Sequence, residues 1–183
     1  ILYAGSSQGN DEFRHLKLLE RICLELDKNI RIIYRAHPWL SDIKTAKKIL
    51  NIKSNIIKID KMMLPFMNKL INKQIYSFYS TDYKYTHDLL GASDIVISPL
   101  STILIEALCH GKESICLIPK DEESLILFND KRKLPCFKDI IEITSVFDPT
   151  YEQADLAAQS LLLSDHPVEG GRRKSNRKKT NRK

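Results

Sequence analysis

Short apolar runs alternate with longer polar and mixed segments along most of this 183-residue chain. Residues 1–4, 30–34, 95–97 and 115–118 form unbroken or nearly unbroken apolar runs. Such runs are typical of strands in a parallel sheet, which are covered on both faces and therefore carry few alternating polar positions. The pattern predicts that these segments lie side by side in the centre of the fold.

Between these runs, apolar residues recur at the spacing of an α-helix. The predicted helices cover residues 11–28, 42–50, 82–90, 103–110, 124–129 and 151–163, and further short strands are predicted at 56–59 and 140–147. Strands that alternate with helices indicate a parallel sheet. We therefore predict a Rossmann-like α/β fold over residues 1–166, with helices on both faces of the sheet. Residues 61–80 are predicted to be an insertion, either a helix and loop or a displaced strand.

The segment from Asp94 to Pro119 contains a complete strand–turn–helix–strand unit. In its turn, Ser98, Ser101 and Thr102 surround Pro99, which ends the strand, and Ser101 or Thr102 can cap the following helix. Gly111 is placed to close that helix. The turn offers hydroxyls and backbone N–H groups at a helix N-terminus, so we predict that it holds a phosphate group.

Glu106 lies in the same predicted helix among apolar neighbours. A carboxylate in apolar surroundings costs free energy unless something hydrogen-bonds it. Helical side chains lean toward the N-terminus, so Glu106 can reach the edge of the sheet where the turn lies. It is therefore a candidate to accept hydrogen bonds from a ribose diol, and the alternative is a solvated side chain on the outer edge of the helix.

Two other polar turns follow predicted strands, at residues 5–10 and 35–39. The first contains Ser6 and Ser7 but has neither a Walker nor a GxGxxG pattern. The second contains Arg35 and His37, which are fixed by Pro38 and can meet a diphosphate or a nucleobase edge. Alternatively, His37 caps the strand and Arg35 is a surface charge. Because ligands of parallel sheets bind outside the carboxyl ends of the strands, all three turns are expected on one rim.

The formal net charge of +6 is concentrated at one end of the chain. Residues 170–183 contain eight of the 29 basic residues and no acid, which leaves 21 basic and 23 acidic residues, or −2, for the rest. The body is thus not expected to bind nucleic acid specifically. Residues 167–183 are predicted to be a disordered basic tail, with three alternatives: a peripheral membrane contact with anionic lipid, a contact with nucleic acid, or an artefact.

The four cysteines show no CxxC spacing, so they are predicted to be reduced core residues in a cytoplasmic protein without bound zinc. No Asp-x-Asp or His-rich cluster predicts a metal site. His15, His87 and His110 have no spacing that indicates a shared ligand. Neither a signal peptide nor an apolar run of membrane-spanning length is present.

The combination of the Gly5–Asn10 turn, His37-Pro38 and the Ser98–Thr102 turn with Glu106 resembles the donor-binding C-terminal half of GT-B glycosyltransferases. The His-Pro pair with a Ser-Thr turn is most similar to the branch that includes bacterial sialyltransferases, Kdo transferases and CDP-glycerol glycerophosphotransferases. The resemblance implies that His37, Ser101 and Thr102 hold the donor nucleotide and its phosphate, and that Glu106 binds the ribose. The three polar turns themselves add Ser6, Ser7, Arg35 and Ser98 as neighbouring nucleotide-binding candidates.

The resemblance further implies a metal-independent transferase of bacterial capsule, lipopolysaccharide or cell-wall synthesis. Its donor would be a CMP-, CDP- or UDP-linked sugar or polyol phosphate, with no other cofactor. The chain begins at Ile1 inside a predicted strand, so a missing N-terminal domain is expected to bind a glycan or lipid-linked acceptor and to supply the catalytic base. The chain alone is then an inactive fragment at the inner face of the membrane. Two alternatives are an isomerase similar to UDP-N-acetylglucosamine 2-epimerase and a non-enzymatic α/β binding module.

Overall fold

The computed structural model describes residues 1–7, 12–26, 29–74, 82–119 and 122–147, with the backbone alone for 141–143 and 145–147. Six parallel strands form one sheet in the order β3-β2-β1-β4-β5-β6. The strands are β1 (Leu2–Ala4), β2 (Ile32–Arg35), β3 (Ile57–Ile59), β4 (Ile95–Pro99), β5 (Glu113–Leu117) and β6 (Ser145–Phe147). The predicted Rossmann-like α/β fold is confirmed.

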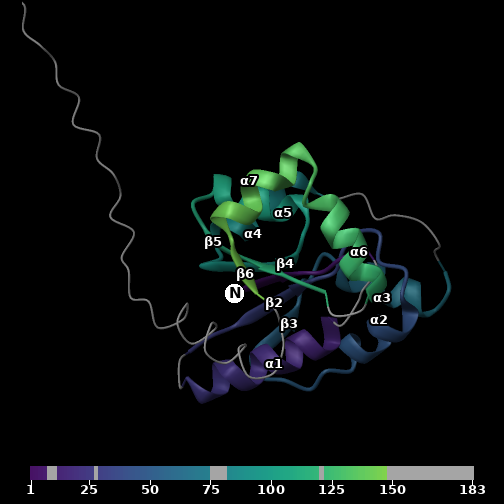
Figure 1. Ribbon diagram of the computed structural model, residues 1–183. Coiled ribbons are helices and arrows are strands. Elements are labelled where there is room, and N and C mark those ends of the chain that lie inside the picture. Colours follow the sequence, from purple (N-terminus) through teal and green to yellow (C-terminus); the bar gives the residue numbers. More distant parts are fainter. Residues whose placement is uncertain (8–11, 27–28, 75–81, 120–121, 148–183) are drawn as a thin grey trace, which may run out of the picture.

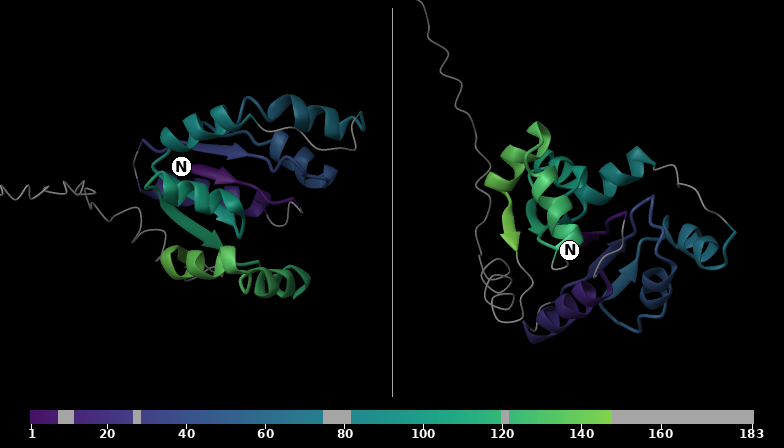
Figure 2. Two further views of the ribbon diagram at one scale, coloured as in Figure 1. Left: turned by 90° about the horizontal axis from the view of Figure 1, so that it is seen from above. Right: turned by 45° about the vertical axis from the view of Figure 1, so that its right-hand side comes forward.

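The helices of the described residues cover both faces of this sheet (Figure 1). They are α1 (Glu12–Glu25), α2 (Ile43–Leu50), α3 (Leu64–Ile71), α4 (Tyr83–Gly91), α5 (Thr102–Cys109), α6 (Glu122–Lys131) and α7 (Pro135–Ile143). In Figures 1 and 2, α1 and α2 lie on one side of the sheet and α4, α5 and α7 on the other. The chain runs from β1 outward to β3 and then returns to β4, so the strand order reverses between β1 and β4.

Alternate residues of the central strands face the two helical layers. Tyr3 and Ile97 pack in one core cluster with Leu16 of α1 and Ile49 of α2. Their neighbours Leu2 and Val96 pack on the other face with α4 and α5 residues such as Leu90 and Ala107. Because both faces are covered, the strands need apolar residues at consecutive positions, which explains the unbroken runs in the sequence.

Local sequence signals set several helix ends. The carboxylate of Asp42 accepts a hydrogen bond from the Lys44 N–H at 2.8 Å and caps α2, and Asp82 caps α4 through the Tyr85 N–H at 3.0 Å. Gly111 ends α5 with φ of 65°, a conformation that costs glycine little. Polar capping and glycine chemistry act over a few residues, which is why the sequence alone predicts them.

Some expectations were wrong. Residues 140–143 belong to α7 rather than to a strand, because Pro135 opens a helix and Phe137 and Ile140 bury at helical spacing. Only 145–147 of that segment form a strand. Of the free cysteines, Cys23 and Cys116 are buried as predicted, whereas Cys109 and Cys136 are exposed.

The insertion predicted at 61–80 contains α3, while residues 75–81 lie outside the described part. The helix predicted at 151–163 and the basic tail at 167–183 also fall outside the described residues. Within the described residues, every helix is too short or too polar to span a lipid bilayer.

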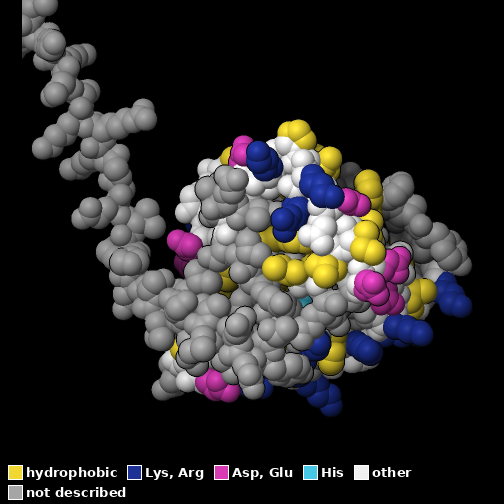
Figure 3. All heavy atoms as spheres, in the orientation of Figure 1, with side chains coloured by type: hydrophobic (Ala, Val, Ile, Leu, Met, Phe, Trp, Pro, Cys, Tyr) yellow, Lys and Arg dark blue, Asp and Glu magenta, His cyan; other side chains and the backbone are white. Residues whose placement is uncertain are grey.

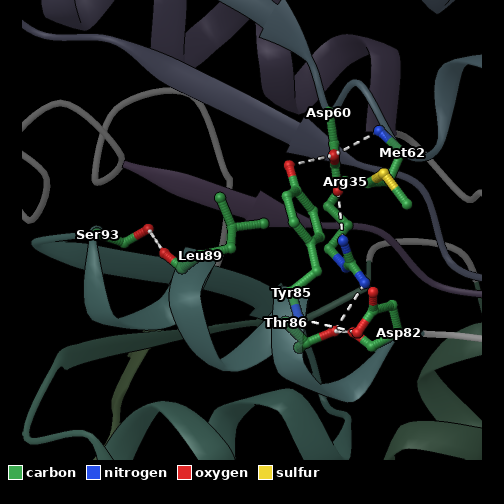
Figure 4. Close-up of polar contacts among 8 residues, drawn as sticks. All are labelled: Arg35, Asp60, Met62, Asp82, Tyr85, Thr86, Leu89 and Ser93. Carbon is green, nitrogen blue, oxygen red and sulfur yellow. Dashed lines mark hydrogen bonds and ion pairs between the residues drawn. The ribbon is translucent and has the colours of Figure 1, made fainter.

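A buried ion pair joins the carboxyl ends of β2 and β3 to α4 (Figure 4). The Arg35 guanidinium, with 6% of its side chain exposed, contacts the fully buried carboxylate of Asp60 and donates a second hydrogen bond to the Thr86 hydroxyl at 2.8 Å. Asp60 also accepts hydrogen bonds from the Tyr85 hydroxyl at 2.8 Å and the Met62 N–H at 2.9 Å. Burial, followed by this contact with Asp60, raises the pKa of Tyr85 to about 12.

We expect Asp60→Ala to lower the free energy of unfolding by about 3–5 kcal/mol, because it leaves the Arg35 charge buried without its partner. Chemical denaturation monitored by circular dichroism measures this. The matched control is Asp88→Ala, which removes the exposed Lys84–Asp88 pair on α4 and should cost less than about 1 kcal/mol. Equal losses in the two variants would show that the buried pair does not brace the fold.

Candidate functional site

A pocket of about 830 Å³ lies at the carboxyl ends of β1, β2 and β4, where the strand order reverses. Open parallel sheets bind ligands at this position, and the volume is typical of a small-molecule site. Five of the predicted site residues line the pocket: Arg35, His37, Ser101, Thr102 and Glu106. The expectation of a shared rim is therefore met for the turns after β2 and β4.

At the end of β2, Arg35 and His37 both line the pocket, but they differ in burial and in hydrogen-bond partners. Arg35 is 5% exposed and directs its guanidinium to Asp60 and Thr86, so the interpretation as a surface charge is wrong. The His37 ring is half-buried, and its Nδ1 accepts a hydrogen bond from the Trp39 N–H at 3.0 Å. In the neutral ring the proton is then on Nε2, which becomes a hydrogen-bond donor.

The pKa of His37 is lowered, first by burial and then by the positive charge of Lys131. Both effects disfavour the imidazolium form, so the ring is neutral near pH 7. Lys131, the last residue of α6, lines the same pocket. The pocket therefore combines a neutral donor from β2 with a cation from α6, and this combination suits an anionic ligand.

At the end of β4, one hydroxyl group is buried and supports a neighbour, whereas others are accessible from the pocket. Ser98 is fully buried, and its Oγ lies 2.9 Å from the Ser101 Oγ. Ser101 is the N-cap residue of α5, but its side chain makes no capping bond to the helix backbone. Thr102 and Glu106 are both exposed at the pocket wall. The N-terminus of α5 thus opens on the pocket with hydroxyls beside it, and Ser98 acts only through Ser101.

The turn after β1 is anchored by hydrogen bonds to Glu12, the first residue of α1. This carboxylate is fully buried and accepts hydrogen bonds from the Ser6 N–H, the Ser6 Oγ at 3.3 Å and the Tyr34 hydroxyl. A Cβ atom on Gly5 would lie 2.7 Å from a Glu12 oxygen, so a side chain at this position would displace the buried carboxylate. Ser6 therefore faces Glu12, and neither Ser6 nor Ser7 is among the residues that line the pocket.

Burial raises the pKa of Glu12 to about 7, although the hydrogen bonds from Tyr34 and Ser6 act in the opposite direction. Its donors are neutral, so they stabilise the carboxylate less than a cation would. In the sequence, Glu12 stands in the first turn of the predicted helix 11–28, where a negative charge is favourable whether or not it is buried. Its burial depends on Tyr34, which is distant in the sequence.

The sequence analysis missed several pocket residues: Trp39, Tyr83, Thr86, Lys131 and Phe137. Trp39 had a usable signal, because it stands two residues after His37 in the same turn. The other four come from helices whose position over the pocket depends on the sheet order. No local pattern marks them.

The remaining histidines of the described residues lie away from the pocket lining. His15 forms a hydrogen bond with the Tyr3 hydroxyl at 2.9 Å. The rings of His87 and His110 lie 4.4 Å apart, although their sequence positions indicated no such pairing. Within the described ranges, no group of three or more His, Cys, Asp or Glu side chains is arranged to hold a metal ion.

Charged side chains of both signs are interspersed on the face shown in Figure 3. This agrees with the near-balanced charge of residues 1–169, where 21 basic residues meet 23 acidic ones. A duplex-binding protein would instead present a continuous basic surface. The described part of this face offers none.

A comparison of the chain with protein-family models, with curated proteins and with solved structures gave no match.

We expect Glu12→Gln to remove a pH dependence of stability. The unfolded state ionises Glu12 near pH 4.5, whereas the folded state keeps the proton until about pH 7. The folded state therefore binds more protons in this window, and the stability of the native protein should fall relative to the variant by about 3 kcal/mol as the pH rises through it. Urea denaturation at pH 4.5, 6 and 7.5 measures the difference.

The control for this experiment is Glu25→Gln, which removes an exposed carboxylate from the same helix. Its stability should follow that of the native protein across the pH range. A constant difference between the native protein and Glu12→Gln at all three pH values would contradict the assignment.

Proposed function

We propose that this chain is the donor-binding half of a metal-independent GT-B glycosyltransferase that uses a nucleotide-activated sugar or polyol phosphate. The observation that carries the proposal is the pocket at the reversal of the strand order, which contains His37, Ser101, Thr102 and Glu106. The resemblance in the sequence assigns donor binding to these same four residues. Sequence positions up to 69 residues apart thus converge on one cavity.

In this proposal the phosphate of the donor binds at the N-terminus of α5. The backbone N–H groups and the helix dipole favour an anion there, and the Ser101 and Thr102 hydroxyls add donors. The Lys131 ammonium contributes a positive charge from the opposite helix, α6. The His37 Nε2 donates a hydrogen bond to the phosphate or to the edge of the base.

Glu106 accepts hydrogen bonds from the two ribose hydroxyls. It lies one turn beyond Thr102 on α5, so its carboxylate and the helix N-terminus serve the same pocket. A carboxylate that is exposed to the pocket has lone pairs available for a diol. This arrangement would distinguish ribonucleotides from their 2′-deoxy forms.

The pocket favours a binding half over a complete catalyst. Among its described lining residues, Glu106 is the only carboxylate and His37 the only histidine. An epimerase of the alternative class would need additional acids and bases around the sugar. On the resemblance in the sequence, we propose that a further N-terminal domain binds the acceptor and supplies the catalytic base. The enzyme would then act in bacterial surface-polysaccharide synthesis at the inner face of the membrane, with the basic tail as its contact to anionic lipid.

The test is titration of the 183-residue chain with CMP, CDP, UMP and UDP by calorimetry, with and without EDTA. We expect weak binding of at least one of these nucleotides that EDTA does not change. His37→Ala should weaken it by about 1–3 kcal/mol, the usual cost of losing a desolvated polar contact. Its melting temperature should change little, because the side chain is only half-buried in a turn.

Two results would contradict this proposal. One is the absence of binding by all four nucleotides at millimolar concentration. The other is a strict requirement for a divalent metal. A large drop in the melting temperature of His37→Ala with unchanged affinity would assign His37 a structural role instead. His110→Ala is the matched control, because His110 lies outside the pocket lining.

A double-mutant cycle tests the role of Glu106. Glu106→Gln has nearly the same volume but accepts fewer hydrogen bonds, so it should weaken ribonucleotide binding without unfolding the protein. The variant should then lose little further affinity for the matching 2′-deoxynucleotide, because the two changes remove the same contact. Additive losses in the two changes would exclude a contact between Glu106 and the ribose.

A further inference from the structure

Two aromatic side chains of the described residues are largely exposed, and both line the candidate pocket. Trp39 is 59% exposed and Tyr83 is 80% exposed, whereas the other exposed large apolar residues are aliphatic. Large aromatic side chains normally bury most of their surface, so an exposed tryptophan is informative. The convergence of both residues on one cavity indicates that an aromatic or flat apolar group of a ligand belongs there.

Trp39 is the better fixed of the two. The backbone N–H of Trp39 donates to the His37 Nδ1 at 3.0 Å, and the backbone N–H of Leu40 donates to the His37 carbonyl at 2.9 Å. The His37 ring stands edge-on to the indole, with centroids 6.0 Å apart and an interplanar angle of 80°. Pro38 restricts the backbone between them. The backbone that carries the indole is therefore fixed before a ligand arrives, and the His37 ring bounds one side of the indole, which lowers the entropy lost on binding.

Tyr83 has less support. It is the first residue of α4, and its large exposed fraction leaves few neighbours to restrict its rotation. Trp39 follows β2 and Tyr83 begins α4, while Ser101 and Thr102 lie at the start of α5 and Lys131 ends α6. The exposed aromatic surface and the groups at the N-terminus of α5 thus come from different elements of the pocket wall.

We propose that Trp39 is the surface on which the nucleobase of the donor stacks, and that it contributes most of the base-dependent affinity. This rests on the proposed function, because it names the position of the base within the same pocket. Stacking requires only a flat π-surface, so Trp39 would favour nucleotides over sugar phosphates without distinguishing strongly between the bases. Selection between cytosine and uracil would then depend on hydrogen bonds from other groups.

Trp39 is the only tryptophan of the chain, so its fluorescence reports on this one position. Titration of the full chain with CMP and UMP should quench this fluorescence in a saturable manner. Ribose 5-phosphate should compete for the pocket without quenching, because it carries no base. Quenching by ribose 5-phosphate as strong as that by CMP would overturn the stacking role and indicate a sugar-binding surface instead.

Calorimetry on Trp39→Ala completes the test. This variant should bind CMP and UMP about 5-fold to 150-fold more weakly, the range expected for the loss of one base–aromatic stack. Its affinity for ribose 5-phosphate should stay within about twofold of that of the native chain. Trp39→Phe keeps a smaller aromatic face and should restore part of the nucleotide affinity. Leu24→Ala, on the exposed surface of α1, is the control and should change the affinity for neither the nucleotides nor ribose 5-phosphate.

The failure of this inference is distinguishable from that of the proposed function. If the native chain binds CMP or UMP and Trp39→Ala binds them equally well, the stacking role is wrong and the donor-binding assignment stands. If the Trp39→Ala variant loses as much affinity for ribose 5-phosphate as for CMP, Trp39 shapes the pocket rather than binding the base. If the native chain binds no nucleotide, both assignments fail.

Discussion

The buried ion pair between Arg35 and Asp60 is the interaction on which one side of the candidate site depends. Both charges are removed from water, and each is compensated by further hydrogen bonds to Thr86, Tyr85 and the Met62 N–H. Such a pair contributes little net stability compared with apolar packing, but the loss of one member leaves a charge without compensation. The pair therefore fixes α4 against the ends of β2 and β3. Arg35 also places His37 two residues further on, so the same contact that holds the fold positions a candidate ligand-binding side chain.

A second buried carboxylate, Glu12, holds the neighbouring strand end in a different way. Asp60 has a guanidinium partner, whereas Glu12 accepts hydrogen bonds from Ser6 and Tyr34, which are neutral. Neutral donors compensate burial less completely, and the raised pKa of Glu12 is the consequence. Gly5 adapts to this carboxylate by lacking a side chain, and it also lines the pocket. The turn after β1 is therefore shaped by the carboxylate beneath it, and Ser6 is used for support.

Features that depend on a few neighbouring residues were predictable from the sequence. The buried strands, the caps at Asp42 and Asp82 and the glycine end of α5 belong to this class. The grouping of His37 with Ser101, Thr102 and Glu106 was predictable because parallel strands end on a common rim. The partners of Arg35 and Glu12 were not, since Asp60, Thr86 and Tyr34 lie 25, 51 and 22 residues away in the sequence. The role of Lys131 was hidden for the same reason, because no local pattern places the end of α6 over the pocket.

The electrostatics of the pocket couple ligand binding to protonation under the proposed function. In the free pocket, burial and Lys131 keep His37 neutral, and the Trp39 N–H occupies its Nδ1. A bound phosphate would bring negative charge to the same space and offset the effect of Lys131, which would raise the pKa of His37. Protonation would require Nδ1 to release the Trp39 N–H, since an imidazolium has no acceptor nitrogen. The hydrogen bond from the Trp39 backbone N–H therefore opposes protonation of His37 even when a phosphate favours it, so the same turn that positions Trp39 also favours the neutral ring.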